Sequence, residues 1–217
     1  MIRSLTVTVG ALVAVAGYLQ AQDGGRFAVT RGSDTMAVER FSRADVQLTG
    51  DLVRVASASA RERFHYQATL VDNQSAPLVE VTAWRGDDPE GSPARQTTRV
   101  IFKGDSVAVD DASRWSGLVT RVLPTAQAAI PYLNLSLAML ELATRRAAQA
   151  RGDTLSVPFF NLGGGQTVIG MVRRVGADST AIRIGAVEFR LKVDATGRIL
   201  GGSVPSQGLT ISRTAGS

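Results

Sequence analysis

Strict alternation of apolar and polar side chains is the feature of this 217-residue chain that most restricts its fold. Near the C-terminus, Val187, Phe189, Leu191 and Val193 alternate with charged residues, and the same period recurs over residues 63–70. Successive side chains of a β-strand point to opposite faces, so a period of two predicts strands with one buried and one polar face.

Turn signals that contain glycine separate these stretches, as at Gly104-Asp105 and Gly176-Ala177-Asp178. Glycine readily adopts the positive φ angle that tight hairpin turns require. The sequence therefore predicts a mostly β protein, an antiparallel meander that forms a closed or half-open barrel. Another turn, at Gly50-Asp51, is expected to separate two strands. Besides the two alternating stretches, strands are expected at residues 26–31, 35–43, 45–49, 52–57, 77–85, 97–103, 106–110, 166–175, 179–185, 198–204 and 208–213.

The segment from about 131 to 150 breaks this alternation and predicts one helix packed against the barrel. Pro131 suits the first position of a helix, and strong helix formers follow it. Leu133, Leu137 and Leu140 make an apolar stripe along the segment. Two roles are open for these three leucines: a lid over the barrel interior, or a surface that docks onto a membrane or a partner protein.

Residues 1–22 have the pattern of a secretory signal peptide. Arg3 precedes an uncharged, mostly apolar run from Leu5 to Leu19, and the small residue Ala21 follows. As a helix this run would span about 22 Å, less than the roughly 30 Å of a bilayer core. We therefore expect export, to the periplasm or outside the cell, and a single domain over residues 23–217. A retained N-terminal membrane anchor is the alternative.

The residues available for catalysis are few. The chain has no cysteine, which excludes disulfides, thiolate metal sites, iron–sulfur clusters and a cysteine nucleophile. His65 is the only histidine, and no Gly-x-Ser-x-Gly motif presents a nucleophilic serine. The adjacent acids Asp110 and Asp111 would point to opposite faces of a strand. We expect no catalytic residue, no metal site and no cofactor, and a hydrogen-bonding role for His65.

The charge balance is mildly basic. The chain has 24 lysines and arginines against 19 acidic residues, a net charge of +5. Nucleic-acid-binding proteins concentrate positive charge on a stripe or tail, whereas these arginines are scattered along the chain. No nucleic-acid partner is therefore expected, although weak attraction to anionic lipid or polysaccharide surfaces remains open.

Residues 27–41 begin with a strand, a glycine turn and a second strand, and residues 193–200 introduce the last strands through another glycine turn. In this plan the chain resembles exported bacterial families of unknown function that form a lipocalin-like or lipoprotein-carrier-like antiparallel barrel around a helix. It is also similar to the polyisoprenoid-binding barrels. The resemblance is architectural, and it implies a cavity or groove between sheet and helix that could hold an apolar ligand.

The expected function is that of a non-enzymatic exported protein that binds a lipid-like or other apolar small molecule, with affinity from buried apolar surface. The alternative is a structural or interaction subunit that docks onto a membrane or an envelope complex. A third hypothesis is an enzyme that uses His65. The residues expected to contact the ligand are Phe64, Tyr66, Trp84, Phe102 and Phe189.

Overall fold

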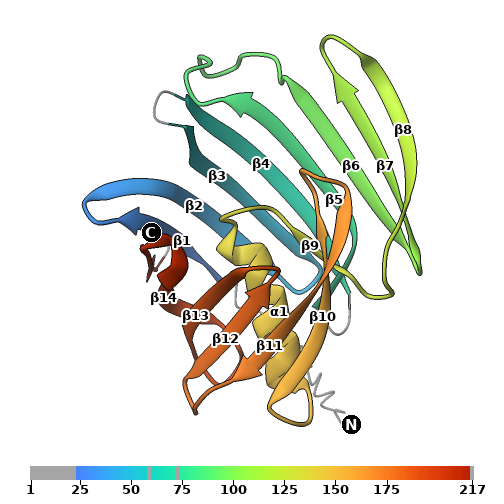
Figure 1. Cartoon of the computed structure of the whole chain (residues 1–217). Helices are drawn as coiled ribbons and strands as arrows, with labels where there is room; N and C mark the ends of the chain where they lie inside the picture. Colours follow the sequence, from blue (N-terminus) through green and yellow to red (C-terminus); the bar gives the residue numbers. More distant parts are fainter. Residues whose placement is uncertain (1–22, 58–59, 72–73, 216–217) are drawn as a thin grey trace, which may run out of the picture.

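The computed structural model describes residues 23–57, 60–71 and 74–215, so the predicted signal peptide at residues 1–22 lies outside the described residues. Fifteen strands form one sheet in the order β8-β7-β6-β5-β4-β3-β2-β1-β15-β14-β13-β12-β11-β10-β9 (Figure 1). The strands are β1 (Asp23–Arg31), β2 (Asp34–Ala44), β3 (Gln47–Ser57), β4 (Ala60–Val71), β5 (Ser75–Arg85), β6 (Gln96–Lys103), β7 (Ser106–Ser113), β8 (Gly117–Pro124), β9 (Ile130–Tyr132), β10 (Thr154–Asn161), β11 (Gln166–Arg174), β12 (Ser179–Ile184), β13 (Val187–Val193), β14 (Ile199–Val204) and β15 (Leu209–Thr214).

The sheet curls around one α-helix, α1 (Leu137–Gln149), as Figure 1 shows. Every pair of neighbouring strands is antiparallel except β9 and β10, which are parallel. No backbone ladder joins the end strands β8 and β9 within the described residues, so the barrel is half-open. The predicted mostly β, antiparallel meander with one packed helix is confirmed. No helix in the described part of the chain is long and apolar enough to cross a membrane.

The helix is shorter than the predicted segment of about 131–150. Pro131 lies in β9 and not at the start of the helix, because the chain first pairs with β10. Ser136 is the residue that caps α1, and its side chain accepts a hydrogen bond from the backbone N–H of Met139. A serine side chain supplies the acceptor that the first turn of a helix needs. The segment that interrupts the alternation of apolar and polar residues therefore contains a short strand, a turn and then the helix.

The predicted turn at Gly50-Asp51 is wrong, since β3 runs through both residues without interruption. Gly50 pairs with Tyr66 on the neighbouring strand β4. A Cβ atom at position 50 would lie 2.3 Å from the Tyr66 hydroxyl oxygen, so the tyrosine ring occupies the space that a side chain would fill. The glycine permits a close approach of a ring to the backbone.

The helix is enclosed by the sheet. Side chains on all sides of its first two turns are buried, including Leu137 and Leu140 at about 1% exposure and Met139 at 0%. They pack with inward-facing strand residues such as Phe27 and Phe189 in one hydrophobic core. The interior of the half-open barrel is therefore filled largely by the helix.

A buried carboxylate joins the N-terminal end of α1 to the sheet. Glu39 of β2 is 1% exposed. One of its oxygens accepts hydrogen bonds from the hydroxyls of Tyr66 (2.7 Å) and Ser136 (2.5 Å). The other accepts them from the backbone N–H groups of Leu137 (2.7 Å) and Ala138 (3.0 Å). Burial raises the pKa of Glu39, although all four hydrogen bonds act to lower it.

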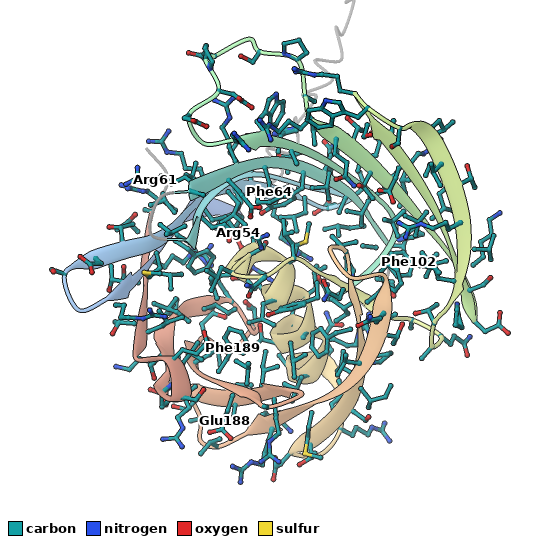
Figure 2. The ribbon with its side chains drawn as sticks, turned by 45° about the horizontal axis from the view of Figure 1, so that its top comes forward. Arg54, Arg61, Phe64, Phe102, Glu188 and Phe189 are labelled. Atoms are coloured by element: carbon teal, nitrogen blue, oxygen red, sulfur yellow. The ribbon has the colours of Figure 1, made fainter. Side chains whose placement is uncertain are left out.

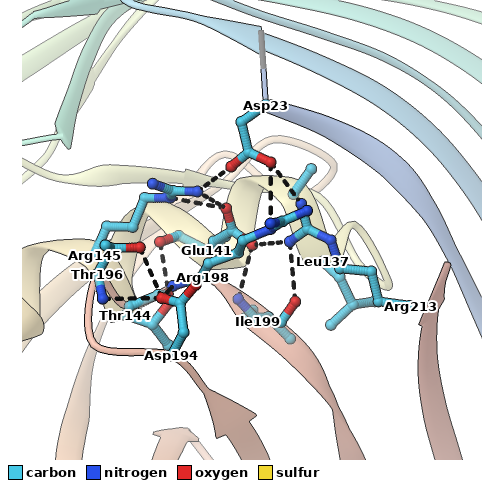
Figure 3. Close-up of polar contacts among 12 residues, drawn as sticks. Asp23, Leu137, Glu141, Thr144, Arg145, Asp194, Thr196, Arg198, Ile199 and Arg213 are labelled. Atoms are coloured by element: carbon cyan, nitrogen blue, oxygen red, sulfur yellow. Dashed lines mark hydrogen bonds and ion pairs between the residues drawn. The ribbon is translucent and has the colours of Figure 1, made fainter. Parts of the chain in front are cut away.

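A second polar cluster joins the middle of α1 to β1, β14 and β15 (Figure 3). Glu141, 1% exposed, accepts hydrogen bonds from the guanidinium of Arg213 (2.7 Å) and from the backbone N–H of Ile199 (2.8 Å). Arg213 also pairs with Asp23 at 2.9 Å. Arg145 pairs with both Glu141 and Asp23. The guanidinium of Arg213 thus bridges β1, β14, β15 and α1.

Replacing Glu39 tests the first anchor. Glu39→Ala leaves two helix N–H groups and two hydroxyls without an acceptor, so we expect the free energy of unfolding to fall by about 3–5 kcal/mol. Glu39→Gln should cost much less, because an amide oxygen can accept from the helix. Urea denaturation measures both, and equal losses in the two variants would contradict this role.

The same residue makes a pH prediction. Because the pKa of Glu39 is raised in the folded state, its contribution to stability is fully present below about 4.5, its ordinary pKa, and is lost as the pH rises through the folded value. As the pH rises above about 4.5 and through the folded-state pKa, the free energy of unfolding of the wild-type protein should therefore fall relative to that of Glu39→Gln. Urea denaturation at a series of pH values measures the difference.

Replacing Arg213 tests the second anchor. Arg213→Met leaves Glu141 buried with one cationic partner fewer, and we expect a loss of about 3 kcal/mol in the free energy of unfolding. Arg190→Met is the control, because that side chain is 67% exposed on β13. Thermal and urea denaturation should separate the two, and a loss of equal size in both variants would show that the cluster does not hold the helix.

Candidate functional site

A groove lies on the inner side of the sheet, between the strands β3–β8 and the turn that joins β10 to β11. Its volume is about 480 Å³, within the range of small-molecule sites. Figure 2 shows Arg54 and Phe64, two of its residues, on the inner side of the sheet. The apolar part of its lining comes from Phe64, Val81, Ala83, Val109, Leu133, Phe160 and Leu162.

A polar cluster forms one wall of this groove. Asp111 of β7 accepts hydrogen bonds from Thr98 (2.6 Å) and Gln96 (3.0 Å), and it pairs with Arg121 of β8. Partial burial acts to raise the pKa of Asp111, but the hydrogen bonds from these three side chains outweigh it and leave the pKa lowered. The carboxylate therefore holds Arg121 in place across the two outermost strands of this end of the sheet.

Arg54 of β3 forms the facing part of the lining. Its Nε donates to Glu62 at 2.8 Å, and a terminal nitrogen donates to the backbone oxygen of Asn134 at 3.3 Å. Its guanidinium lies 4.7 Å from the centre of the Phe64 ring, within the range of a cation–π contact. One arginine thus connects the sheet, the segment before α1 and the aromatic residue of the groove.

The groove continues into a wider depression of about 830 Å³ toward the ends of β4, β5 and β7. Both tryptophans of the chain, Trp84 and Trp115, line it. Trp115 is 71% exposed, and the guanidinium of Arg95 lies 5.7 Å from its ring. The two parts of the groove share six lining residues: Arg54, Phe64, Ala83, Gln96, Asp111 and Arg121.

The lining of the depression is strongly basic. Five arginines, Arg54, Arg61, Arg85, Arg95 and Arg121, face two carboxylates, Glu62 and Asp111. The arrangement therefore suits an anionic group near exposed aromatic rings, next to an apolar groove. Among the residues that the structure describes, no three His, Asp or Glu side chains lie together as a metal-binding group.

The inner end of the groove is closed where the two ends of the sheet meet. The turn at Gly163–Gly165 contacts β8, and a Cβ atom at Gly165 would lie 2.9 Å from a methyl group of Leu123. Beside it, the hydroxyls of Thr125 and Thr167 are 2.8 Å apart. The three consecutive glycines of this turn thus lie where the chain after β10 approaches β8.

The structure brings some of the predicted ligand-contacting residues together and not others. Phe64 lines both the groove and its depression, and Trp84 lines the depression. Tyr66 is buried against Glu39, Phe102 packs edge-on against Phe160 at 5.6 Å, and Phe189 is 3% exposed. Phe189 faces the interior beside the helix in Figure 2.

Of the three helix leucines predicted as a lid or docking surface, Leu133 lies before α1 and lines the groove. Leu137 and Leu140 are inside the hydrophobic core. His65 lies on the outer side of β4, where its Nδ1 is 2.9 Å from a carboxylate oxygen of Asp51. The three leucines and His65 therefore do not form one site.

The polar residues of the groove were not anticipated. These residues lie on four strands, and the local sequence predicts an ordinary solvent-facing position for each of them: Arg54, Gln96, Thr98, Asp111 and Arg121. The alternation assigns residues such as Arg54 and Thr98 to one face of a predicted strand, whereas Arg121 lies on β8, which was not among the predicted strands. Which face becomes concave depends on how the sheet curls around α1, and periodicity does not carry this information.

Replacing Asp111 tests the polar wall. Asp111→Asn removes the charge that orders Arg121, and we expect a loss of about 1 kcal/mol in the free energy of unfolding at neutral pH. Because the pKa of Asp111 is lowered in the folded state, this difference should be present above the ordinary carboxyl value of 3.8 and disappear as the pH falls through the folded value. Urea denaturation over this pH range measures the difference between the variant and the wild type. Glu80→Gln, which removes the charge of an exposed pair with Arg99, is the control.

Comparison with known proteins gives relatives in fold. No family model matches the chain, and no curated protein matches its sequence. The crystal structure of a DUF1089 family protein from Pseudomonas aeruginosa is similar with a TM-score of 0.60 and 14% identity, over 78% of this chain and 90% of that one. A beta-barrel-like protein of domain of unknown function DUF1849 from Brucella abortus is similar with a TM-score of 0.51 and 9% identity, over 90% and 97%. The chain thus shares the fold of beta-barrel-like domains of unknown function.

Proposed function

We propose that this protein is an exported, non-enzymatic binding protein, and that its ligand has an apolar portion and an anionic group. The ligand lies in the groove between β3–β8 and the β10–β11 turn. The observation that carries the proposal is the continuity of an apolar groove with an arginine-rich depression. The predicted lid role of α1 is not part of it, because Leu137 and Leu140 are enclosed in the core.

The groove, and not the barrel interior, is the ligand site in this proposal. The interior is occupied by α1 and the side chains packed on it. In the groove, Phe64 and Phe160 and the aliphatic residues beside them offer apolar contact. Burying about 150 Å² of apolar ligand surface there would contribute about 4 kcal/mol.

The depression supplies the polar part of recognition. Arg61 and Arg85 are exposed at its lining, and their guanidinium groups can donate two parallel hydrogen bonds to a carboxylate or phosphate. Trp84 and Trp115 add flat apolar surfaces beside them. An amphipathic anion would therefore place its acidic group at the arginines and its chain along the apolar groove.

The proposal predicts binding of oleate, a fatty acid with one carboxylate, and weaker binding of uncharged oleyl alcohol. Trp84 and Trp115 are the only tryptophans of the chain, so their fluorescence reports on the depression directly. Arg61→Ala combined with Arg85→Ala should weaken oleate binding about tenfold or more. The matched control is Arg99→Ala, on β6 and paired with Glu80, which should leave binding unchanged.

A groove-filling variant tests the apolar part. Ala83 lines both parts of the groove, so Ala83→Phe should reduce the affinity for oleate, whereas Ala112→Phe at an exposed position of β7 should not. Circular dichroism confirms that both variants fold. If Ala83→Phe binds oleate with the same affinity as the wild type, the ligand lies elsewhere and the proposal is wrong.

Export and the natural ligand are tested together. The full chain is expressed in a bacterium, and the protein is recovered from the periplasmic fraction for native mass spectrometry and organic extraction. We expect a chain mass that lacks the signal peptide and a co-purifying lipid-sized anion. Recovery of the full-length mass from the cytoplasm would contradict export.

A further inference from the structure

We propose that the outer face of β11–β14 is a second interaction surface, and that it docks onto a lipid bilayer containing anionic phospholipids. This face is separate from the groove, which lies on the inner side of the sheet. The inference does not depend on the groove's ligand. It rests on the charge of the face, on the aliphatic side chains around it and on its shape.

Four cations gather on this face. Arg190 and Lys192 alternate along β13 with buried side chains, and Figure 2 shows the neighbouring Glu188 on the outer side of the same strand. Arg183 pairs in register with Glu188. Arg173 and Arg190 both pair with Ala181, one from each side of β12. Four positive side chains therefore share this face of the four strands with one acid.

The single acid is neutralised by its neighbours. The Nε of Arg190 donates to the carboxylate of Glu188 at 2.9 Å, and Arg183 lies 3.9 Å from the same carboxylate. The hydrogen bond from Arg190, followed by the charges of Arg190, Arg183 and Arg173, lowers the pKa of Glu188. The surface thus keeps a net positive charge, and Arg190 and Arg183 remain 67% and 65% exposed.

Exposed aliphatic side chains accompany these cations. Ile169 is 61% exposed, Met171 49%, Val175 60% and Leu200 48%. Met171 pairs in register with Arg183, so apolar and cationic side chains are direct neighbours. A soluble polyanion would gain nothing from the aliphatic groups, whereas a bilayer can take them into its headgroup region while its phosphates meet the cations.

The face is also hollowed. A depression of about 850 Å³ is lined by Arg173, Arg190, Lys192 and by the backbone of Gly201 and Gly202. The two glycines have φ angles of +156° and +151°, and a Cβ atom at Gly202 would lie 2.2 Å from the backbone oxygen of Arg190. Only glycine fits there. The hollow leaves room for a phospholipid headgroup between the cations.

Sedimentation with vesicles tests the inference. We expect the protein to bind vesicles of phosphatidylcholine with roughly a third phosphatidylglycerol, and to bind pure phosphatidylcholine at least tenfold more weakly. Arg190→Glu combined with Lys192→Glu should reduce binding to the mixed vesicles about tenfold or more. The matched control is Arg99→Glu with Lys103→Glu on β6, with the same change in net charge. Equal losses in both double variants would overturn the proposal.

Two further comparisons separate a bilayer from other partners. Met171→Ser with Leu200→Ser should weaken vesicle binding, whereas Leu118→Ser with Val122→Ser, at exposed positions of β8, should not. If Met171→Ser with Leu200→Ser binds the mixed vesicles as tightly as the wild type, the partner is a soluble polyanion and the proposal is overturned. If the glutamate variant fails to fold by circular dichroism, Arg190→Gln with Lys192→Gln replaces it. Oleate binding should be unaffected by these variants, which separates this surface from the groove.

Discussion

The carboxylate of Glu39 is the contact on which the rest of the arrangement depends. A carboxyl group in an apolar interior is tolerated only when hydrogen-bond partners surround it, and here four donors come from β4, from the cap residue Ser136 and from the first turn of α1. The contact fixes where the helix begins. It also fixes the segment just before the helix, whose Leu133 and Asn134 belong to the groove lining.

The two polar anchors have complementary effects. Glu39 holds the beginning of α1, and the cluster of Glu141, Arg145 and Arg213 holds its middle, with apolar packing between them. Sliding or rotating the helix would separate both sets of partners at once. The groove therefore has one wall of fixed geometry.

The sequence predicted the fold class because alternation and glycine turns report directly on strands. It failed where tertiary contacts override the local pattern. Gly50 was expected in a turn, but the ring of Tyr66 from the next strand requires a glycine in the middle of β3. The short strand β9 precedes the helix and was hidden within an apolar run, so the predicted helix began six residues early.

The site was less predictable than the fold. Aromatic residues were expected in the ligand site by type, but of these Phe64 lines the groove and its depression, and Trp84 lines the depression alone. Phe189 has the same alternation as Phe64 and lies in the core. Which aromatic residues border the groove follows from how the whole sheet curls, and not from any local stretch.

The contact between β8 and β11 has a mechanical consequence. The two ends of the sheet meet there through side chains, Leu123 against Gly165 and Thr125 against Thr167, without a backbone ladder. A ladder consists of several cooperative hydrogen bonds, whereas this junction has one hydrogen bond between two hydroxyls and one apolar contact. The line between β8 and β11 therefore lacks the backbone bonding that joins neighbouring strands elsewhere in the described sheet.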